Sequence, residues 1–444
     1  MTSRINLYFL IFAAELKGNL LKSLSDRDRN HVWHPLTQHK LHPYTLPISR
    51  AKGALLFDEA GKSYIDGIAS WYTCMYGHCN PYILEKVWEQ MQQLDQVVFT
   101  GFTHEPAVAL AEALMEILPF GQQKVFYSDN GSTAVEIGIK MALQYHANRG
   151  HRRPVLLAFE NGFHGDTFGA MSVSGLSVYN GPFEEFFLQV ERIPVPNEGN
   201  IAELLDQLEK RLARNDLAAF IYEPLVQGAA GMRMHSGTGL DQVLALLRTH
   251  GVLSIADEVM TGFGKTGTYF ASDQLQTKPD IVCLSKALTA GLLPMAVTSC
   301  SQQVYDAFYS DELEKGLFHG HTYTANPLAC TAALAGIGLL RSEETQAQIH
   351  RIEAAHRKFE ARIKTHRLVE TTRQCGVIFA MDLNLPMERY GRLRDRLYTH
   401  FMDHGVYLRP LGNTIYILPP YCISDSELEQ VYDSIFSALE SLQK

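Results

Sequence analysis

The chain has 444 residues, and its 39 lysines and arginines against 48 aspartates and glutamates give a formal net charge of −9. At 46% hydrophobic and 20% charged residues, it is a folding chain rather than a disordered one, long enough for two or three domains. The acidic balance without a long basic run argues against nucleic acid as the main partner. Its seven scattered cysteines, with no C-x2-C pair, argue against a disulfide scaffold or zinc site and favour a reducing, cytoplasmic location.

The first 25 residues are expected to be an extension ahead of the domains. An apolar stretch, Leu7 to Ala14, follows Arg4 in the manner of a short signal peptide, but a membrane span needs about 20 residues. We interpret the stretch as an appendage to the folded domains rather than an export signal. The rest of the chain has no candidate membrane span, so no membrane partner is expected.

From about residue 70 to residue 325, short apolar strands alternate with amphipathic helices. Helices are expected over 106–118, 131–148, 201–214 and 239–250, and strands over 125–127, 155–159, 217–222, 252–256, 281–284 and 295–299. Strands that are almost uniformly apolar are typical of parallel strands buried on both faces. The alternation predicts a doubly wound α/β domain with a large, mostly parallel sheet.

After Asn326 the pattern changes to a smaller α+β unit. Helices are expected from 327, over 346–366, 389–404 and 426–442, with strands over 377–383, 406–408 and 415–418. We expect this unit to pack with the N-terminal part of the chain as one small domain. The predicted division is therefore an extension (1–25), the first part of the small domain (26–70), the large domain (71–325) and the rest of the small domain (326–444).

Two of the apolar strands end in residues that suit pyridoxal phosphate chemistry. One runs into Asp257 and the other into Ser285-Lys286, and function in open α/β sheets lies at the carboxyl ends of strands. Burial lowers the pKa of a lysine, so that its neutral amine can form a Schiff base. An aspartate can keep the pyridine nitrogen protonated, which makes the ring an electron sink. Taken singly, Lys286 is also compatible with an ordinary surface lysine, and Asp257 with a residue that caps the next helix.

Three further segments suit the same cofactor. Residues 128–133 open a helix whose backbone N–H groups and hydroxyls can bind a phosphate, although they also form a good N-cap. Residues 160–167 follow a strand and offer Phe163 as a flat ring to stack on the cofactor, between glycines that permit close approach. Residues 320–327 precede a helix and can supply another hydroxyl to the phosphate.

In this order these residues resemble the class III aminotransferases, which have the fold-type I architecture. Asp257-Glu258-Val259, Gly262-Phe263-Gly264, Ser285-Lys286 and Gly291 carry that resemblance. Other blocks are similar to the branch of the class that serves biotin synthesis by aminating 8-amino-7-oxononanoate. They are His31–Pro35, Asp66–Ile68, Ser70-Trp71, His164–Ser172, Gln227–Ala229, Gly231–Arg233, Arg409-Pro410 and Pro419–Tyr421, and the match runs from about residue 25 to the C-terminus.

The resemblance implies a cofactor site residue by residue. Lys286 would be the catalytic Schiff-base lysine, Asp257 would pair with the pyridinium nitrogen, and Phe163 would stack on the ring. Gly131 and Ser132 would bind the phosphate of pyridoxal 5'-phosphate. Thr322 and the backbone of His321 would complete that phosphate site from the second subunit of a homodimer, with the active site at the interface.

The resemblance also implies a pocket for two small molecules, a keto acid and an amino donor. Trp71, Gly320, Phe163 and Lys286 would line it, with Leu36 and Asp166 as further candidates. Arg409 would bind the carboxylate of the keto acid through its planar guanidinium. No residue is expected to bind a metal, since the histidines at 31, 34, 39 and 42 fit no zinc spacing. Gly262–Thr266 ends like a P-loop but has Val259 where that motif needs glycine.

Three positions depart from the usual pattern of the family. Leu36 and Phe163 stand where tyrosines are usual, and His321 stands where proline is usual. The loss of two hydroxyls makes the site more apolar, which leaves the donor open between S-adenosylmethionine, the usual one, and lysine or another amine. The alternative activities are an ω-amino acid transaminase of the same class, an aminomutase, which would need no separate donor, and a non-catalytic binding protein.

Overall fold

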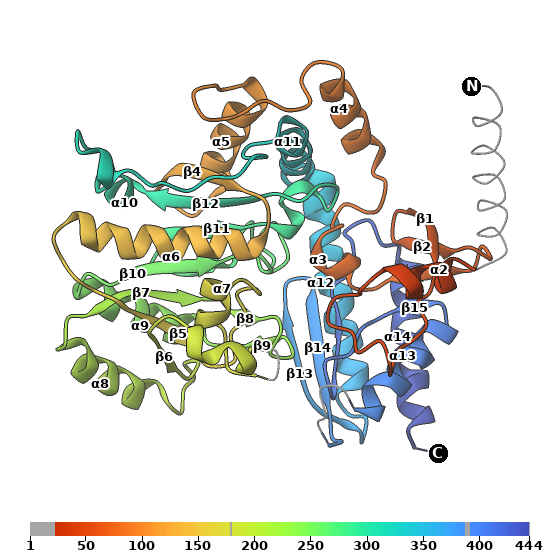
Figure 1. The fold of residues 1–444 in the computed structure, drawn as a ribbon. Coiled ribbons are helices and arrows are strands. Elements are labelled where there is room, and N and C mark those ends of the chain that lie inside the picture. The colour runs from red at the N-terminus through yellow and green to blue at the C-terminus, as the bar shows by residue number, and fades with distance from the viewer. Residues whose placement is uncertain (1–22, 178–179, 387–390, 444) are drawn as a thin grey trace, which may run out of the picture.

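The computed structural model describes residues 23–177, 180–386 and 391–443. The apolar stretch Leu7–Ala14 lies outside the described residues. The centre of the fold is a seven-stranded sheet with the strand order β4-β12-β11-β10-β7-β5-β6 (Figure 1). Its strands are β4 (Gln122–Ser128), β5 (Val155–Phe159), β6 (Val190–Ile193), β7 (Leu217–Tyr222), β10 (Leu253–Asp257), β11 (Ile281–Leu284) and β12 (Ala296–Ser301).

The sheet is parallel except for one strand. β10 pairs in parallel with β7 and β11, and β5 pairs in parallel with β7 and β6. β12 runs antiparallel to both of its neighbours, β11 and β4. The expected α/β architecture with a mostly parallel sheet is therefore confirmed. The carboxyl ends of its parallel strands meet along one edge, which is where such sheets bind ligands.

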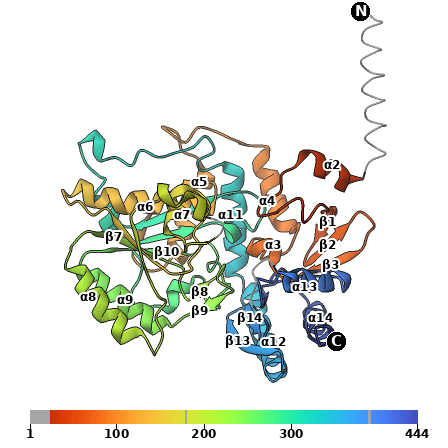
Figure 2. The same ribbon diagram turned by 60° about the horizontal axis from the view of Figure 1, so that its bottom comes forward.

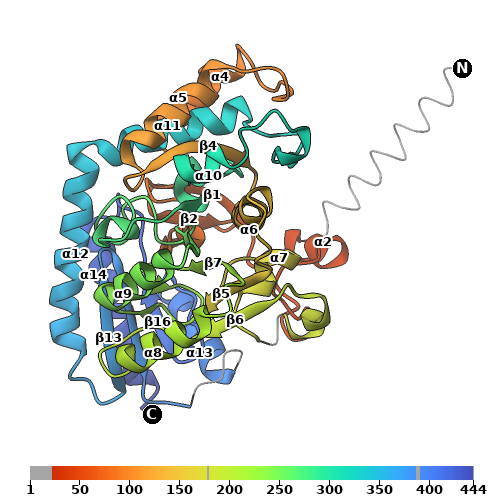
Figure 3. The same ribbon diagram turned by 90° about the vertical axis from the view of Figure 1, so that its left-hand side faces the viewer.

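Helices cover both faces of this sheet, as parallel strands require. α6 (Gly131–Asn148) packs on one face and α9 (Gly237–Thr249) on the other, with α8 (Ile201–Leu212) beside α9. Figure 3 shows α6 and α9 on opposite sides of β7. Successive residues of β10 alternate between the two cores: Ile255 belongs to the cluster beneath α6, and Ala256 to the one beneath α9. Burial on both faces explains why these strands are uniformly apolar.

A second layered unit lies beside the large sheet (Figure 1). Its antiparallel sheet has the order β13-β14-β16 and is accompanied by three helices. The elements are α12 (Glu343–Ile363), β13 (Val369–Cys375), β14 (Ile378–Leu383), α13 (Arg392–Asp403), β16 (Thr414–Ile417) and α14 (Asp425–Ser441). β13 was not expected from the sequence, because its Glu, Thr, Arg and Gln side chains do not form an apolar run, as suits an edge strand.

An N-terminal and a C-terminal segment of the chain meet in a third sheet. Its order is β1-β2-β3-β15, with strands at Ile48–Lys52, Leu55–Asp58, Ser63–Asp66 and Val406–Tyr407. β15 pairs in parallel with β3, so that Val406 lies opposite Ile65 and Tyr407 opposite Asp66. Figure 2 shows β1–β3 beside α13 and α14. The expected association of the two terminal parts is thus present, while the proposed domain boundaries stay a prediction.

The remaining elements connect these sheets. They are α2 (Leu24–His31), α3 (Ala69–Tyr72), α4 (Pro81–Met91), α5 (Glu105–Ile117), α7 (Phe168–Val173), η1 (Gly181–Phe186), β8 (Val226–Gln227), β9 (Arg233–Met234), η2 (Ala271–Gln274), η3 (Lys286–Thr289), α10 (Gln302–Asp306), η4 (Leu313–Lys315) and α11 (Pro327–Arg341). α11 packs against α4, α5 and η3. Within the described part of the chain, none of the helices is long and apolar enough to cross a membrane. The same residues contain no cluster of three potential metal ligands.

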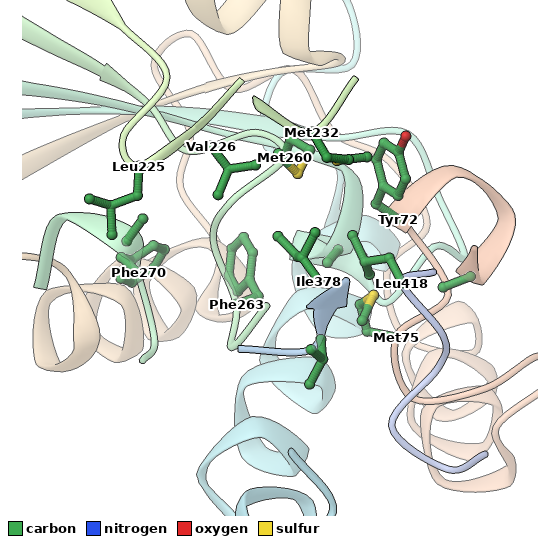
Figure 4. Close-up of a cluster of buried hydrophobic side chains, with 14 of the residues drawn as sticks. Tyr72, Met75, Leu225, Val226, Met232, Met260, Phe263, Phe270, Ile378 and Leu418 are labelled. Atoms are coloured by element: carbon green, nitrogen blue, oxygen red, sulfur yellow. The ribbon is translucent and has the colours of Figure 1, made fainter. Parts of the chain in front are cut away.

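A buried apolar cluster joins the large sheet domain to the second unit (Figure 4). Tyr72 and Met75 enter it from the segment around α3, and Ile378 and Leu418 enter it from the second unit. The large domain contributes side chains that follow β7 and β10, namely Leu225, Val226, Met232, Met260, Phe263 and Phe270. The cluster therefore fixes the segment around α3 between the two units.

Candidate active site

Polar side chains gather where four parallel strands of the large sheet end. Asp257 is the last residue of β10, and Lys286 follows β11 by two positions. Glu223 directly follows β7, and the loop after β5 contains Phe163 and His164. Because these strands run in the same direction, their ends lie along one edge of the sheet.

Asp257 is held in a fixed orientation. Its Oδ2 lies 2.7 Å from Nδ1 of His164, and its Oδ1 accepts a hydrogen bond from the backbone N–H of Val259 at 3.1 Å. Asp257 and His164 are both buried. The backbone N–H of His164 donates in turn to Ser174 Oγ at 2.9 Å. The arrangement presents an anchored carboxylate that can pair with a cationic ring nitrogen. No role was expected for His164 from the sequence.

The amine of Lys286 is a candidate nucleophile. Burial lowers its pKa below the usual value for lysine, although the carboxyl groups of Asp257 and Glu223 act in the opposite direction. Its Nζ lies 5.8 Å from the centre of the Tyr72 ring. The backbone of Lys286 is in the left-handed region, with φ of 48°, which is rare for a residue with a side chain. Such strained positions often occur at functional sites.

Glu223 is a buried carboxyl group that sequence analysis missed. It accepts hydrogen bonds from the backbone N–H groups of Phe163 at 3.0 Å and Gly228 at 2.9 Å. Burial raises its pKa to about 7, with His164 lowering it and Asp257 raising it further. Glu223 thus ties the end of β7 to the loop of Phe163. The signal was available, since Glu223 follows an apolar strand as Asp257 does.

The N-terminus of α6 forms a cradle suited to a phosphate. The Asn130 side chain caps the helix by accepting from the N–H of Thr133 at 3.1 Å. Ser132 Oγ accepts from the backbone N–H of Asp166 at 3.1 Å, which brings the loop after β5 onto the helix. A Cβ atom on Gly165 would lie 2.1 Å from Ser132 Oγ, so only glycine fits there. The free N–H groups and dipole of an 18-residue helix favour an anion at this point.

Trp71 and Arg409 lie together although they are far apart in the sequence. The guanidinium carbon of Arg409 lies 4.8 Å from the centre of the Trp71 ring. The parallel pairing of β3 and β15 explains this, since Trp71 shortly follows β3 and Arg409 shortly follows β15. Trp71 and Phe163 are 41% and 40% exposed, so both residues have a surface available to a ligand.

Trp71 belongs to a left-handed turn that the sequence did not predict. Ala69, Ser70, Trp71 and Tyr72 have φ values of 46°, 46°, 67° and 71°. Helical hydrogen bonds close the turn, from Tyr72 N–H to Ile68 O and from Thr73 N–H to Ala69 O, both at 2.9 Å. Each L-residue in this conformation costs about 1–2 kcal/mol. The turn directs Trp71 to Arg409 and Tyr72 to Lys286, and the Tyr72 hydroxyl lies 3.0 Å from that of Tyr416.

Four of the expected site residues are not bonded to this group. The backbone oxygen of Thr322 accepts from Gln96 Nε2 at 2.9 Å, and a Cβ atom on Gly320 would have no neighbour within 4 Å. Leu36 is exposed. Among the described residues, no hydrogen bond or ion pair joins Leu36, Gly320, His321 or Thr322 to Lys286, Ser132 or Asp257. Their roles stay predictions.

Comparison with known proteins gives one consistent family. The model of the family described as "Aminotransferase class-III" matches residues 36–439. The adenosylmethionine-8-amino-7-oxononanoate aminotransferase of Synechococcus elongatus is 43% identical over 423 residues, which cover 93% of this chain and 99% of that protein.

Solved structures agree with this similarity. The crystal structure of the adenosylmethionine-8-amino-7-oxononanoate aminotransferase from Methanocaldococcus jannaschii aligns with a TM-score of 0.90 at 33% identity, covering 94% of this chain and 98% of that one. The omega transaminase from Pseudomonas jessenii in complex with PMP aligns with a TM-score of 0.87 at 26% identity, covering 95% and 98% of the two chains.

Proposed function

Because the chain belongs to the class III aminotransferases, we propose that it transfers an amino group from a donor amine to the ketone of 8-amino-7-oxononanoate. The product is 7,8-diaminononanoate, a step of biotin synthesis, and the donor leaves as a ketone. The observation that carries this choice of acceptor is the contact between Arg409 and Trp71. A guanidinium against an aromatic wall suits a keto acid whose carboxylate is separated from the ketone by an apolar chain.

The residues fit pyridoxal 5'-phosphate as the cofactor. Ser132 and the N–H groups at the start of α6 would hold its phosphate, and Gly165 leaves space for the close approach of the two segments. Asp257, oriented by His164, would pair with the ring nitrogen, and Phe163 would cover a face of the ring. Lys286 would attach the cofactor covalently. Bound pyridoxal phosphate supplies a ring that withdraws electrons from the substrate carbon when its proton leaves.

Lys286 would also carry the proton. Its lowered pKa favours the neutral amine, which can take a proton from the substrate carbon and return it when the acceptor ketone is aminated. Tyr72 beside Lys286 and Trp71 beside Arg409 would place the reacting carbon and the carboxylate at the two ends of one pocket. The substrate would therefore be oriented by its distant carboxylate.

We infer S-adenosylmethionine as the donor, with lysine as the alternative. The names of the Synechococcus elongatus and Methanocaldococcus jannaschii proteins, which begin with adenosylmethionine, support the first choice. Phe163, which has no hydroxyl, favours a donor that depends less on hydrogen bonds at this position. Both donors have a cationic group remote from the transferred amine, so the present site does not separate them by charge.

We also propose a homodimer that completes the active site. Large apolar side chains are exposed on α4, on the loop after it and around residue 320, namely Trp88, Val98, Phe102, Phe318 and Tyr323. The hydrogen bond between Gln96 and Thr322 joins the last two of these segments. A second copy covering them would bury this surface and bring residues 320–322 to the partner's phosphate site. Light scattering should report a dimer, and Phe102→Asp should weaken it together with cofactor binding.

The free cysteines support a cytoplasmic location.

The decisive experiment offers the purified holoenzyme 8-amino-7-oxononanoate with S-adenosylmethionine, lysine or glutamate in parallel. We expect 7,8-diaminononanoate, identified by mass spectrometry, with S-adenosylmethionine and to a lesser extent with lysine.

The similarity to the Pseudomonas jessenii enzyme favours a second candidate, an ω-amino acid transaminase. Turnover of ω-amino acids with pyruvate and none of the keto acid would establish the second candidate and refute the first. Isomerisation without any donor would indicate an aminomutase.

A further inference from the structure

The left-handed turn at Ala69–Tyr72 contains no glycine, so contacts outside its own backbone must hold it. Its position matters for the proposed function because it carries both Trp71 and Tyr72. If the turn relaxed to a right-handed or extended form, the two rings would leave Arg409 and Lys286. The question is therefore which side chains fix this turn.

Asp66 provides the main attachment. It is fully buried at the end of β3, and its Oδ2 accepts from Ser70 Oγ at 2.8 Å, within the turn. Its Oδ1 lies 3.3 Å from the backbone N–H of Ile68. One carboxylate thus binds both the residue before the turn and a residue inside it. The bond from Ser70 to Asp66 stabilises the left-handed form, because it is made with Ser70 in that conformation.

His78 holds Asp66 from the other side. Its Nε2 lies 2.8 Å from Asp66 Oδ2 and 3.4 Å from Ser70 Oγ. Its backbone is fixed by two hydrogen bonds with Gly53, one donated at 2.8 Å and one accepted at 3.0 Å. Burial disfavours the imidazolium, but hydrogen bonds to Asp66 and Cys74 outweigh burial and raise the pKa of His78 to about 10. His78 is therefore a charged partner with a fixed backbone.

The same residues align the turn with Arg409. Asp66 lies opposite Tyr407 in the β3–β15 pair, and Gly67 N–H donates to Tyr407 O at 3.1 Å. Arg409 follows only two residues after Tyr407. Asp66 therefore lies where the backbone leading to Trp71 and the backbone leading to Arg409 are joined.

From this geometry we infer that Asp66 and His78 are positioning residues, which hold the Trp71 turn so that the substrate's carboxylate binds between Trp71 and Arg409. The inference rests on the proposed function for its substrate. Neither residue touches the substrate or the cofactor in this scheme. Their loss should weaken binding of the carboxylate without changing the chemistry at Lys286.

The kinetic test uses Asp66→Asn, His78→Ala and His78→Gln in the holoenzyme. For 8-amino-7-oxononanoate we expect KM to rise about tenfold or more in Asp66→Asn and His78→Ala, with kcat changed less than about threefold. For 2-aminooctan-3-one, which lacks the carboxylate, KM should not rise. Glutamine can still donate to Asp66, so His78→Gln should recover most of the loss.

A second readout does not depend on turnover. Replacing Trp33 and Trp88 by phenylalanine leaves Trp71 as the single tryptophan of the chain. In that background His78→Ala should increase acrylamide quenching of Trp71 at least twofold, and His78→Gln should restore protection. If the parent enzyme does not aminate the keto acid, the proposed function fails, while this measurement still decides whether His78 holds the turn.

His356→Gln is the matched control, because His356 is a buried histidine bonded to Tyr432 and Val377, away from the turn. It should lower the melting temperature and leave both KM values and Trp71 quenching unchanged. Equal rises of KM for the two ketones in Asp66→Asn and His78→Ala would overturn the inference, as would unchanged quenching in His78→Ala.

Discussion

The guanidinium of Arg409 lies above the ring of Trp71, 4.8 Å from its centre. A cation over an indole contributes about 0.5–2 kcal/mol, depending on how far it is removed from water. The contact therefore limits the motion of a long, flexible side chain before any substrate arrives. An oriented guanidinium can bind a planar carboxylate with less loss of entropy than a free one.

Replacing Arg409 by methionine should remove the ion pair with the keto acid and keep most of the apolar contact with Trp71. Hydrogen bonds to charged groups contribute about 1.5–3 kcal/mol, so KM for 8-amino-7-oxononanoate should rise about 10- to 100-fold. Steady-state kinetics measure this. KM for 2-aminooctan-3-one should stay the same, and a rise for both ketones would show that Arg409 supports the fold rather than the carboxylate.

Replacing Lys286 by alanine should lower kcat by about 10³-fold or more, since proton transfer by a positioned group contributes about 10²–10⁴-fold. Borohydride reduction followed by peptide mapping should label Lys286 in the parent enzyme and no residue in the variant. Lys265→Met is the control, because Lys265 is a buried lysine whose Nζ donates to Gly262 O at 2.8 Å. Labelling of Lys265 instead of Lys286 would contradict the assignment.

Replacing Gly165 by alanine should weaken cofactor binding. The new Cβ atom would overlap Ser132 Oγ, and the positive φ of 133° disfavours alanine as well. Titration of the cofactor-free protein with pyridoxal phosphate should give a Kd at least about tenfold higher. Gly338→Ala is the control, because the added Cβ meets no atom within 4 Å and the residue lies in α11. Unchanged affinity in Gly165→Ala would mean that the cradle is not the phosphate site.

Glu223 should make the cofactor-free protein less stable as the pH rises. Its pKa is about 7 in the folded protein against 4.5 for an ordinary glutamate, so the folded state binds the proton more tightly between these values. The contribution of Glu223 to stability is full below pH 4.5 and is lost as the pH rises through 7. Between pH 5.5 and 8 the free energy of unfolding of the parent protein should fall by about 2 kcal/mol relative to that of Glu223→Gln. Urea unfolding of both proteins at several pH values measures it; parallel curves would contradict the prediction.

Phe163→Tyr tests the choice of donor. The ring of Phe163 is partly exposed, so an added hydroxyl would reach the pocket without being buried. We expect KM for S-adenosylmethionine to fall about threefold to tenfold, because one neutral hydrogen bond contributes about 1 kcal/mol. Parallel assays with lysine and S-adenosylmethionine give the comparison. No change with either donor would show that the hydroxyl at this position has no part in donor recognition.

The central elements could be predicted from sequence because each has a local cause. Strands β5, β7 and β11 and helix α6 have the expected bounds, since uniform apolar runs and an Asn-Gly cap mark them directly. The antiparallel direction of β12 was not predictable, because its apolar pattern is the same whichever way it runs. β13 was missed because an edge strand can be polar, so no apolar run marks it in the sequence.

The site, too, has residues that the sequence indicated and one feature that it did not. Asp257 and Lys286 were expected because each follows an apolar strand, and the structure brings these two side chains together at the ends of β10 and β11, while their roles stay predictions. The turn around Trp71 could not, because nothing in an Ala-Ser-Trp-Tyr segment indicates a left-handed conformation without glycine. It depends on Asp66 and His78, which contact one another only once the chain is folded.

The parallel pairing of β3 with β15 has a consequence for how the chain is made. The two strands are separated by roughly 340 residues, and at about 5–20 residues per second a ribosome needs roughly 20–70 s to travel that distance. During this interval the nascent chain has β3 without its partner and Trp71 without Arg409. The carboxylate pocket is thus among the last parts to be completed, after the sheet that holds Asp257 and Lys286 has been synthesised.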